Sequence, residues 1–275
     1  MSGTMTEMAY QPIPQPVLQP PLQSALQPEA FDWDDYYAHV VTEDDEPVDN
    51  LFSAKQQTLL KRALYASWTP PAREGQTARS FLADVNVGIF GAPGVPPIVP
   101  DFFLSLDVKP HPLLREKRHR SYFIREFGKP PDVAVEIVSN KEGGELGSKL
   151  ERYAELGVRY YVVFDPLCEL SRETLQLFEL ADGVYQRRGD LTLPEIGLGL
   201  ALWEGDYEGF HEVWLRWTTP AQGLLPLGQE RAVEAEGRAA QAEGRVAREA
   251  AARRHAETQA ARLAAQLRAL GIEPE

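Results

Sequence analysis

The chain has 275 residues, of which 25% are charged and 43% are hydrophobic, and its formal net charge at pH 7 is −13. This composition is ordinary for a globular protein with one substantial core. A single cysteine, Cys168, excludes an internal disulfide framework and a cysteine-based zinc site, so a reducing, cytoplasmic location is expected. The N-terminus lacks the features of a signal peptide, and no stretch approaches the roughly 20 apolar residues of a membrane span. We therefore expect a soluble protein without a membrane partner.

The negative charge is concentrated near the N-terminus. Residues 1–50 hold ten acidic side chains and no lysine or arginine, whereas residues 229–275 balance eight acidic side chains against eight arginines, which leaves −3 for residues 51–228. Inside that middle part lies a basic run with interleaved aromatic residues, whose candidate nucleic-acid-binding members are Arg115, Lys117, Arg118 and Arg120. A mildly acidic protein can hold DNA on one basic edge. The alternative interpretation of this run is a solvated loop and helix face.

In chain order, the Pro- and Gln-rich residues 1–30 are expected to be disordered, and residues 31–220 to form the main domain. Leucines at helical spacing predict a helix over residues 52–68, with Ser53 as its N-cap. The β-prone runs at residues 81–90 and 98–108, separated by a turn-rich segment, predict neighbouring strands.

Residues 130–166 combine a β-branched run, a helix that stops at Gly157 and a second apolar run, which is the pattern of a strand–helix–strand unit. Residues 174–190 resemble a hairpin with an Asp182-Gly183 turn. The pattern of residues 191–218 predicts its helices or strands less clearly. From about residue 229 to 270 the Ala/Glu/Arg-rich sequence predicts a long helix, a weak coiled coil that could join a homodimer or hold a partner protein.

Three charged residues stand out within the main domain. Asp101 begins an apolar strand, where a lone aspartate is most often a turn or cap residue. Glu136 lies in VAVEIVS with apolar neighbours, and an ionised carboxylate in a buried strand is costly unless it is paired or bound to a metal. Lys149 lies at the edge of the buried stripe of the following helix, so its ammonium can reach that strand. The alternative for Lys149 is an exposed ion pair with Glu145.

These residue types suit magnesium-assisted hydrolysis. Mg²⁺ prefers hard oxygen ligands, commonly one or two carboxylates together with water and a substrate phosphate. A nearby lysine can position the attacking water or stabilise developing negative charge.

The order of the PD in IVPDFF, the strand DVAVEIVS and the helix before YAELGVRYYVVFDP resembles the Uma-type restriction endonuclease family, a branch of the PD-(D/E)XK nuclease superfamily. The resemblance covers roughly residues 31–215. It implies an α/β fold, a restriction-endonuclease-like core with a central mixed sheet of about four strands, helices on both sides and added β-hairpins. Fold membership does not itself establish catalysis.

The resemblance also implies roles for individual residues. Asp101 and Glu136 map onto the metal ligands, for Mg²⁺ with Mn²⁺ as a substitute. Val138 stands where the motif's lysine is expected, and Lys149 on the following helix matches the position from which this family commonly supplies it. Glu46 is the best match for an additional acidic site residue, with Asp49 as its rival. Lys141 is the next candidate if Lys149 is not the catalytic lysine.

The leading hypothesis is a Mg²⁺-dependent endonuclease that hydrolyses phosphodiester bonds, with DNA as the expected nucleic-acid partner. The rival is a catalytically weak nuclease-fold module that binds or scaffolds a partner through its C-terminal helix. A non-nuclease metal hydrolase ranks below both, because the histidine ligands that most such sites use are lacking.

Overall fold

The computed structural model describes residues 31–41, 50–72, 79–139, 144–221 and 223–269. Two units are distinguished within the chain, Met1–Leu225 and Pro226–Glu275, and each is described by itself. The segment 1–30, with its expected disorder, and the candidates Glu46, Asp49 and Lys141 lie outside the described residues.

The first unit is built on a six-stranded sheet with the order β1-β3-β5-β6-β7-β8. Strands β5 and β6 run parallel and every other neighbouring pair is antiparallel, so the sheet is mixed, as expected. The predicted neighbours β1 and β3 are paired. The strands are β1 (Phe81–Asp84), β3 (Phe102–Leu106), β5 (Val133–Ile137), β6 (Tyr160–Phe164), β7 (Leu175–Ala181) and β8 (Val184–Arg187).

Local sequence signals set two of the connections in this sheet. Helix α6 (Ser148–Leu156) links β5 to the parallel β6, and it ends at Gly157, whose φ of 81° allows its N–H to return to the carbonyls of Tyr153 and Ala154. The turn between β7 and β8 places Asp182 and Gly183 at φ values of 50° and 79°, which is the left-handed pair that a tight hairpin requires. Both predictions are confirmed.

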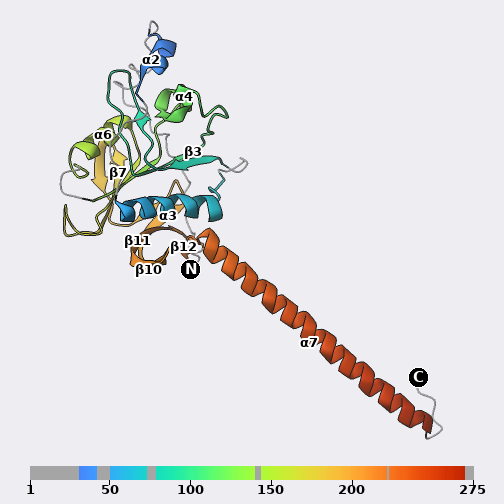
Figure 1. Cartoon of the computed structure of the whole chain (residues 1–275). Helices are drawn as coiled ribbons and strands as arrows, with labels where there is room; N and C mark the ends of the chain where they lie inside the picture. The colour runs from blue at the N-terminus through green and yellow to red at the C-terminus, as the bar shows by residue number, and fades with distance from the viewer. Residues whose placement is uncertain (1–30, 42–49, 73–78, 140–143, 222, 270–275) are drawn as a thin grey trace, which may run out of the picture. The chain divides into compact units, whose positions relative to one another are not determined.

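Helices and a second sheet cover the two faces of the main sheet (Figure 1). On one face, Phe103 and Ala134 join a core cluster with Tyr153 of α6. On the other face, Phe102 packs against Trp217 with ring centroids 5.7 Å apart. That face is also covered by α3 (Leu51–Ser67), which contacts β1 and β3. Flanking helices are therefore present on both sides, as the fold class predicted.

The N-terminus of α3 corrects one expectation. Asn50, not Ser53, is the N-cap, because the Asn50 side chain accepts a hydrogen bond from the Ser53 N–H at 3.0 Å. Ser53 lies inside the helix and is buried. An asparagine cap is as favourable as a serine cap, so the first turn of the helix extends back to Leu51.

The segment whose sequence predicted its elements least clearly forms a second, antiparallel sheet with the order β12-β11-β10-β9. The Gln56 side-chain amide of α3 donates to the Leu215 carbonyl at 2.8 Å and accepts from its N–H at 2.9 Å, and Trp217 Nε1 donates to the Leu60 carbonyl at 3.1 Å. These bonds attach α3 to this sheet. Its strands are β9 (Thr192–Leu193), β10 (Leu198–Tyr207), β11 (Phe210–Thr219) and β12 (Gly223–Leu224).

Short elements complete the first unit. Strands β2 and β4 form a parallel pair, and Tyr37, Phe90 and Phe123 form a small aromatic core beside it. The elements are α2 (Trp33–His39), β2 (Ile89–Phe90), α4 (Lys117–Arg120), β4 (Tyr122–Phe123) and α5 (Ile124–Phe127).

The second unit contains α7 (Gly228–Ala269), an uninterrupted helix of 42 residues that is coloured orange to red in Figure 1. The predicted long helix is confirmed. None of its described residues is buried. Its pairing as a coiled coil stays a prediction. Among the helices that the structure describes, none is long and apolar enough to cross a membrane.

Candidate metal and catalytic site

Asp101 and Glu136 lie at the same end of two adjacent strands. Phe102 of β3 is paired with Val135 of β5, and continuing this antiparallel register by one residue sets Asp101 opposite Glu136. Side chains of directly opposite residues project from the same face of a sheet. The structure therefore brings together the two carboxylates that the sequence singled out.

Asp101 is held by two neighbouring elements. Its Oδ2 accepts a hydrogen bond from the Ile137 backbone N–H of β5 at 2.6 Å, and its Oδ1 accepts one from Gln57 Nε2 of α3 at 2.9 Å. Gln57 is itself buried and exchanges hydrogen bonds with the Asn86 side chain. Asp101 is thus a fixed group at the junction of helix and sheet, and not a solvated turn residue.

Glu136 is 2% exposed, and its two oxygens have different donors. The Tyr153 hydroxyl donates to Oε1 at 2.6 Å, and Lys149 Nζ donates to Oε2 at 2.9 Å. Burial raises the pKa of Glu136 above its usual range, and Lys149 and Tyr153 offset that effect only in part. A cation bound next to Glu136 would favour its ionised form and so lower this raised pKa.

Lys149 lies between two carboxylates. Its Nζ is 2.9 Å from Glu136 Oε2 and 3.3 Å from Glu145 Oε1, and its side chain is 28% exposed. Both pairings considered from the sequence therefore exist at once. Burial opposes the charged form, but Glu136, Glu145 and Asp101 outweigh it and raise the pKa of Lys149. The ammonium is charged at neutral pH and retains access to solvent.

Glu145 is a component of this cluster whose burial the sequence did not reveal. It is 5% exposed, and its Oε2 is buried without a hydrogen-bond partner in the part of the chain that the structure describes. Its backbone carbonyl accepts a hydrogen bond from the Tyr161 hydroxyl at 2.9 Å, which fixes the segment before α6. The spacing of four residues to Lys149 was the available signal, but it predicted only an ion pair on the surface.

The donor set fits a small, hard cation. An ionised carboxylate offers about four acceptor positions, of which Glu136 uses two for Tyr153 and Lys149. Asp101 on the adjacent strand supplies a second carboxylate, and Glu145 Oε2 is a buried oxygen without a hydrogen-bond donor among the described residues. Within the described ranges, no group of three or more His, Cys, Asp or Glu side chains is arranged to hold a metal. Two carboxylates completed by water or phosphate oxygens suit Mg²⁺.

The buried Asp165, at the end of β6, does not add to this set. Its carboxylate accepts hydrogen bonds from the backbone N–H groups of Glu169 and Leu170, both at 2.8 Å. These bonds shape the loop that follows β6, so Asp165 has a structural role.

A family comparison matches residues 46–202, which is more than half of the chain, to the model described as "Uma2: Putative restriction endonuclease". The chain belongs to the Uma2 family. A search of curated proteins and a search of solved structures each gave no match. The family indicates nuclease function in general terms. The matched residues of this Uma2 protein include Asp101, Glu136 and Lys149 and do not include α7.

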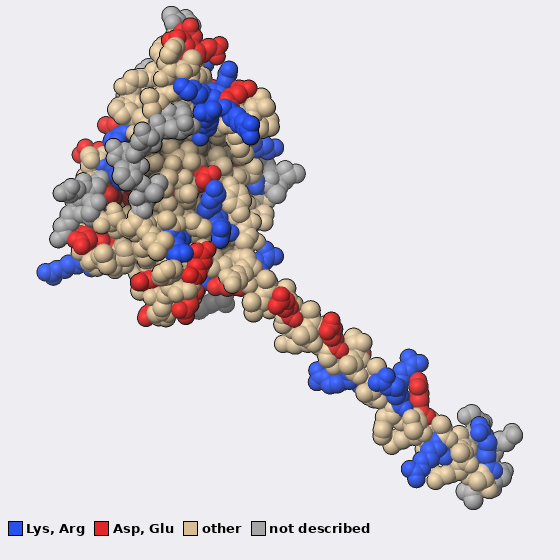
Figure 2. Space-filling model, in the orientation of Figure 1, with Lys and Arg blue, Asp and Glu red and all other residues tan. Residues whose placement is uncertain are grey.

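Some side chains of the basic run contact other parts of the same chain. Lys117 Nζ donates to the Ala38 carbonyl at 2.8 Å, and so it binds the C-terminal end of α2. Arg118 lies 3.7 Å from Asp34 of α2, and Arg120 Nε donates to the Arg115 carbonyl at 3.0 Å. Figure 2 shows basic side chains gathered near the top of the molecule, next to acidic ones. The run therefore includes both structural and solvent-facing charge.

Proposed function

We propose that this Uma2 protein is a Mg²⁺-dependent endonuclease that hydrolyses phosphodiester bonds in DNA. The observation that supports the proposal best is the convergence of Asp101 and Glu136, on adjacent strands, with the ammonium of Lys149. This arrangement suits the hydrolysis of a phosphodiester, because the substrate and its transition state are both anionic. The two carboxylates would hold a metal cation, and that cation and the lysine would stabilise the negative charge.

Asp101 and Glu136 would hold the ion, and Mn²⁺ is proposed to substitute for Mg²⁺. When bound, the ion supplies a Lewis acid for a phosphate oxygen and lowers the pKa of the attacking water. Hydrogen bonds from Ile137 N–H and Gln57 keep the Asp101 carboxylate in place. The Tyr153 hydroxyl does the same for Glu136. These supports reduce the reorganisation that ligand binding would otherwise require.

Lys149 would act on the substrate. Its Nζ is the solvent-accessible cation next to Glu136, so it can contact a phosphate oxygen as negative charge develops there. Glu145 holds the ammonium from the other side at 3.3 Å, and this second contact limits the positions that Lys149 can adopt. Glu145 is thus proposed as a positioning residue for Lys149.

Arg115, Lys117, Arg118 and Arg120 are proposed to contact the phosphate backbone of the same DNA. Such contacts would provide affinity that is independent of base sequence and decreases with salt. Because Lys117 also secures α2, the arginines of α4 are the better choice for testing this surface.

The proposal is tested by incubating plasmid and oligonucleotide DNA with the full chain in Mg²⁺, Mn²⁺ or EDTA. Cleavage is expected with either metal ion and not with EDTA. Asp101→Asn should remove cleavage, whereas Asp182→Asn should retain it, because that aspartate lies in the β7–β8 turn, where asparagine also tolerates positive φ. Equal cleavage by the Asp101→Asn protein and the wild type would refute the assignment.

A second candidate function is a scaffold that acts through α7. The observation that favours it is a 42-residue helix in which no described residue is buried. An Ala-rich helix with a heptad-compatible seam can gain burial by pairing with another helix. Sedimentation of the full chain and of a chain ending at residue 227 would distinguish self-association through α7 from a monomer. A scaffold would keep its partner when Asp101 is replaced.

A further inference from the structure

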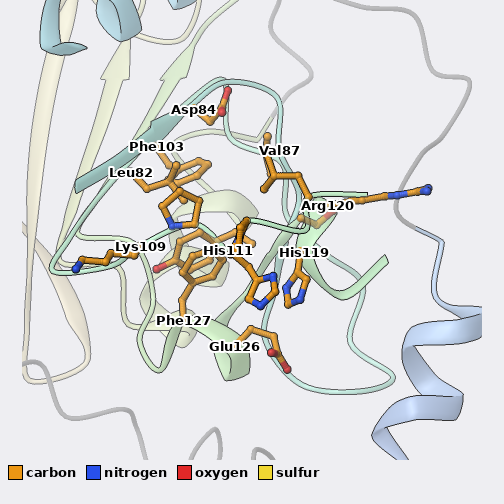
Figure 3. Close-up of a pocket in the computed structure, with 15 residues that line it drawn as sticks. Leu82, Asp84, Val87, Phe103, Lys109, His111, His119, Arg120, Glu126 and Phe127 are labelled. Atoms are coloured by element: carbon orange, nitrogen blue, oxygen red, sulfur yellow. The ribbon is translucent and has the colours of Figure 1, made fainter. Parts of the chain in front are cut away.

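A cavity of about 740 Å³ lies over β1 and β3. Its size is within the range of about 300 to 1,000 Å³ of pockets that take small organic ligands. Figure 3 shows side chains from the strands and from the segment around α4 and α5 converging on it. Most of the lining is apolar or aromatic, and it includes Leu82, Val87, Phe103, His111, Tyr122 and Phe127.

The cavity and the carboxylate pair are on the same face of the sheet. Phe103 and Tyr122, which line the cavity, belong to the core cluster that contains Ala134 and Tyr153. Phe103 follows Asp101 by two residues along β3, a separation of about 7 Å. Asp84, another lining residue, is paired with Phe103 and so lies at the same end of the sheet. A ligand that occupies the cavity would therefore lie beside the candidate metal site.

The walls of the cavity contain two pairs of stacked rings. The His111 and His119 rings are 3.8 Å apart at 15°, and the Tyr122 and Phe127 rings are 4.3 Å apart at 11°. Burial and the neighbouring His111 lower the pKa of His119, which favours a neutral ring at neutral pH. Flat rings at the edge of a cavity are suited to stacking on a planar heteroaromatic group.

Charged groups surround this aromatic lining. The side chains of Lys109 and Arg120 extend away from the cavity on opposite sides (Figure 3). The carboxylates of Asp84 and Glu126 also belong to the lining. Asp84 Oδ1 accepts a hydrogen bond from Lys61 Nζ at 2.6 Å and Glu126 Oε1 accepts one from the Tyr37 hydroxyl at 2.7 Å. The second oxygen of each carboxylate can accept a hydrogen bond from an amino group. Cations and carboxylates around an apolar cavity match a nucleotide whose base enters the cavity while its phosphates stay at the surface.

We infer that the cavity binds one unpaired nucleobase of the nucleic-acid strand whose backbone crosses the Asp101–Glu136 pair. This inference rests on the proposed nuclease function and adds a substrate class to it, namely a strand with an unstacked base next to the cleaved bond. Stacking on aromatic side chains tolerates every base, so the cavity selects for an accessible base more than for a sequence.

The test uses the full chain in EDTA with a short single-stranded DNA that carries one 2-aminopurine, whose fluorescence reports stacking. His111→Ala removes one exposed ring, and Val87→Phe fills part of the cavity; His211→Ala, at an exposed histidine in β11, is the matched control. Binding is expected to weaken about tenfold in both cavity variants, with reduced quenching, and to stay unchanged in the control. A strand of the same length in which every nucleotide is abasic should show a similar loss of affinity with the wild type, because the cavity accepts any base.

Wild-type affinity and quenching in both His111→Ala and Val87→Phe would overturn the inference. Thermal melting identifies a Val87→Phe protein that fails to fold, in which case His111→Ala and the abasic DNA decide. If the cavity variants bind normally while Asp101→Asn loses cleavage, the base site is wrong and the nuclease function stands. If the wild type never cleaves but quenching still depends on the cavity, the base site stands and the nuclease function is wrong.

Discussion

Replacing Lys149 by Met should reduce both the stability of the metal-free protein and the rate of cleavage, by separable mechanisms. The change keeps most of the apolar stem but leaves Glu136 and Glu145, both almost fully buried, without their shared cation. Removing one partner of a buried ion pair costs about 3–5 kcal/mol. We expect about 2 kcal/mol here, because Lys149 is partly exposed and Glu136 can take up a proton.

For a domain of this size, that loss corresponds to a decrease in Tm of about 4–8 °C in EDTA. Saturating Mg²⁺ should restore part of the loss, since the ion neutralises the same carboxylates. Because the pKa of Glu136 is raised in the folded state, lowering the pH from 7 toward 4.5 protonates Glu136 in the folded protein before it does so in the unfolded chain. The difference in Tm between the Lys149→Met protein and the wild type should therefore become smaller as the pH is lowered.

The rate effect is measured by single-turnover cleavage in excess Mg²⁺, at a temperature where both proteins are folded. Loss of one group that stabilises transition-state charge commonly reduces kcat by about 100- to 1,000-fold. DNA affinity in EDTA should change far less, since the contact matters most in the transition state. Wild-type cleavage by the Lys149→Met protein would remove this residue from the mechanism, and attention would turn to Lys141. An equal loss of Tm in EDTA and in Mg²⁺ would refute the shared carboxylate site.

Three further changes test the site, the basic surface and the division of the chain. Asp101→Ala should abolish the increase in Tm that Mg²⁺ causes in the wild type, as measured by differential scanning fluorimetry; an unchanged increase would place the ion elsewhere. Replacing Arg118 and Arg120 by Gln should weaken DNA binding and lower the slope of log K against log salt by about 0.9 for each lost phosphate contact. Identical slopes would leave these arginines outside the interface. Ending the chain at residue 227 should leave the melting of the first unit nearly unchanged, because Met1–Leu225 is a compact unit by itself and no described residue of α7 is buried. A large loss of Tm would show that α7 supports the first unit.

Local and periodic sequence signals determined much of this fold. The Asp182-Gly183 turn needs two left-handed residues and the end of α6 needs one, and both were identified because few residue types adopt those angles. The apolar runs that flank α6 predicted a strand–helix–strand unit, and its two strands are parallel because a helical crossover joins strands in that orientation. Glu136 was singled out by its apolar neighbours, because a buried carboxylate needs a partner.

Tertiary structure alone decided which groups meet. Glu145 is separated from Glu136 by nine positions, and only the packing of α6 on the sheet buries it and places Lys149 between the two carboxylates. In the same way, the pairing of Lys117 with the end of α2 depends on a contact across 79 positions. The sequence of β11 did not predict a strand clearly, because its pattern reflects packing against α3, through Gln56, as much as its own alternation. Periodicity in a sequence records which face of an element is buried, whereas the partner on that face is set by the three-dimensional packing of distant segments.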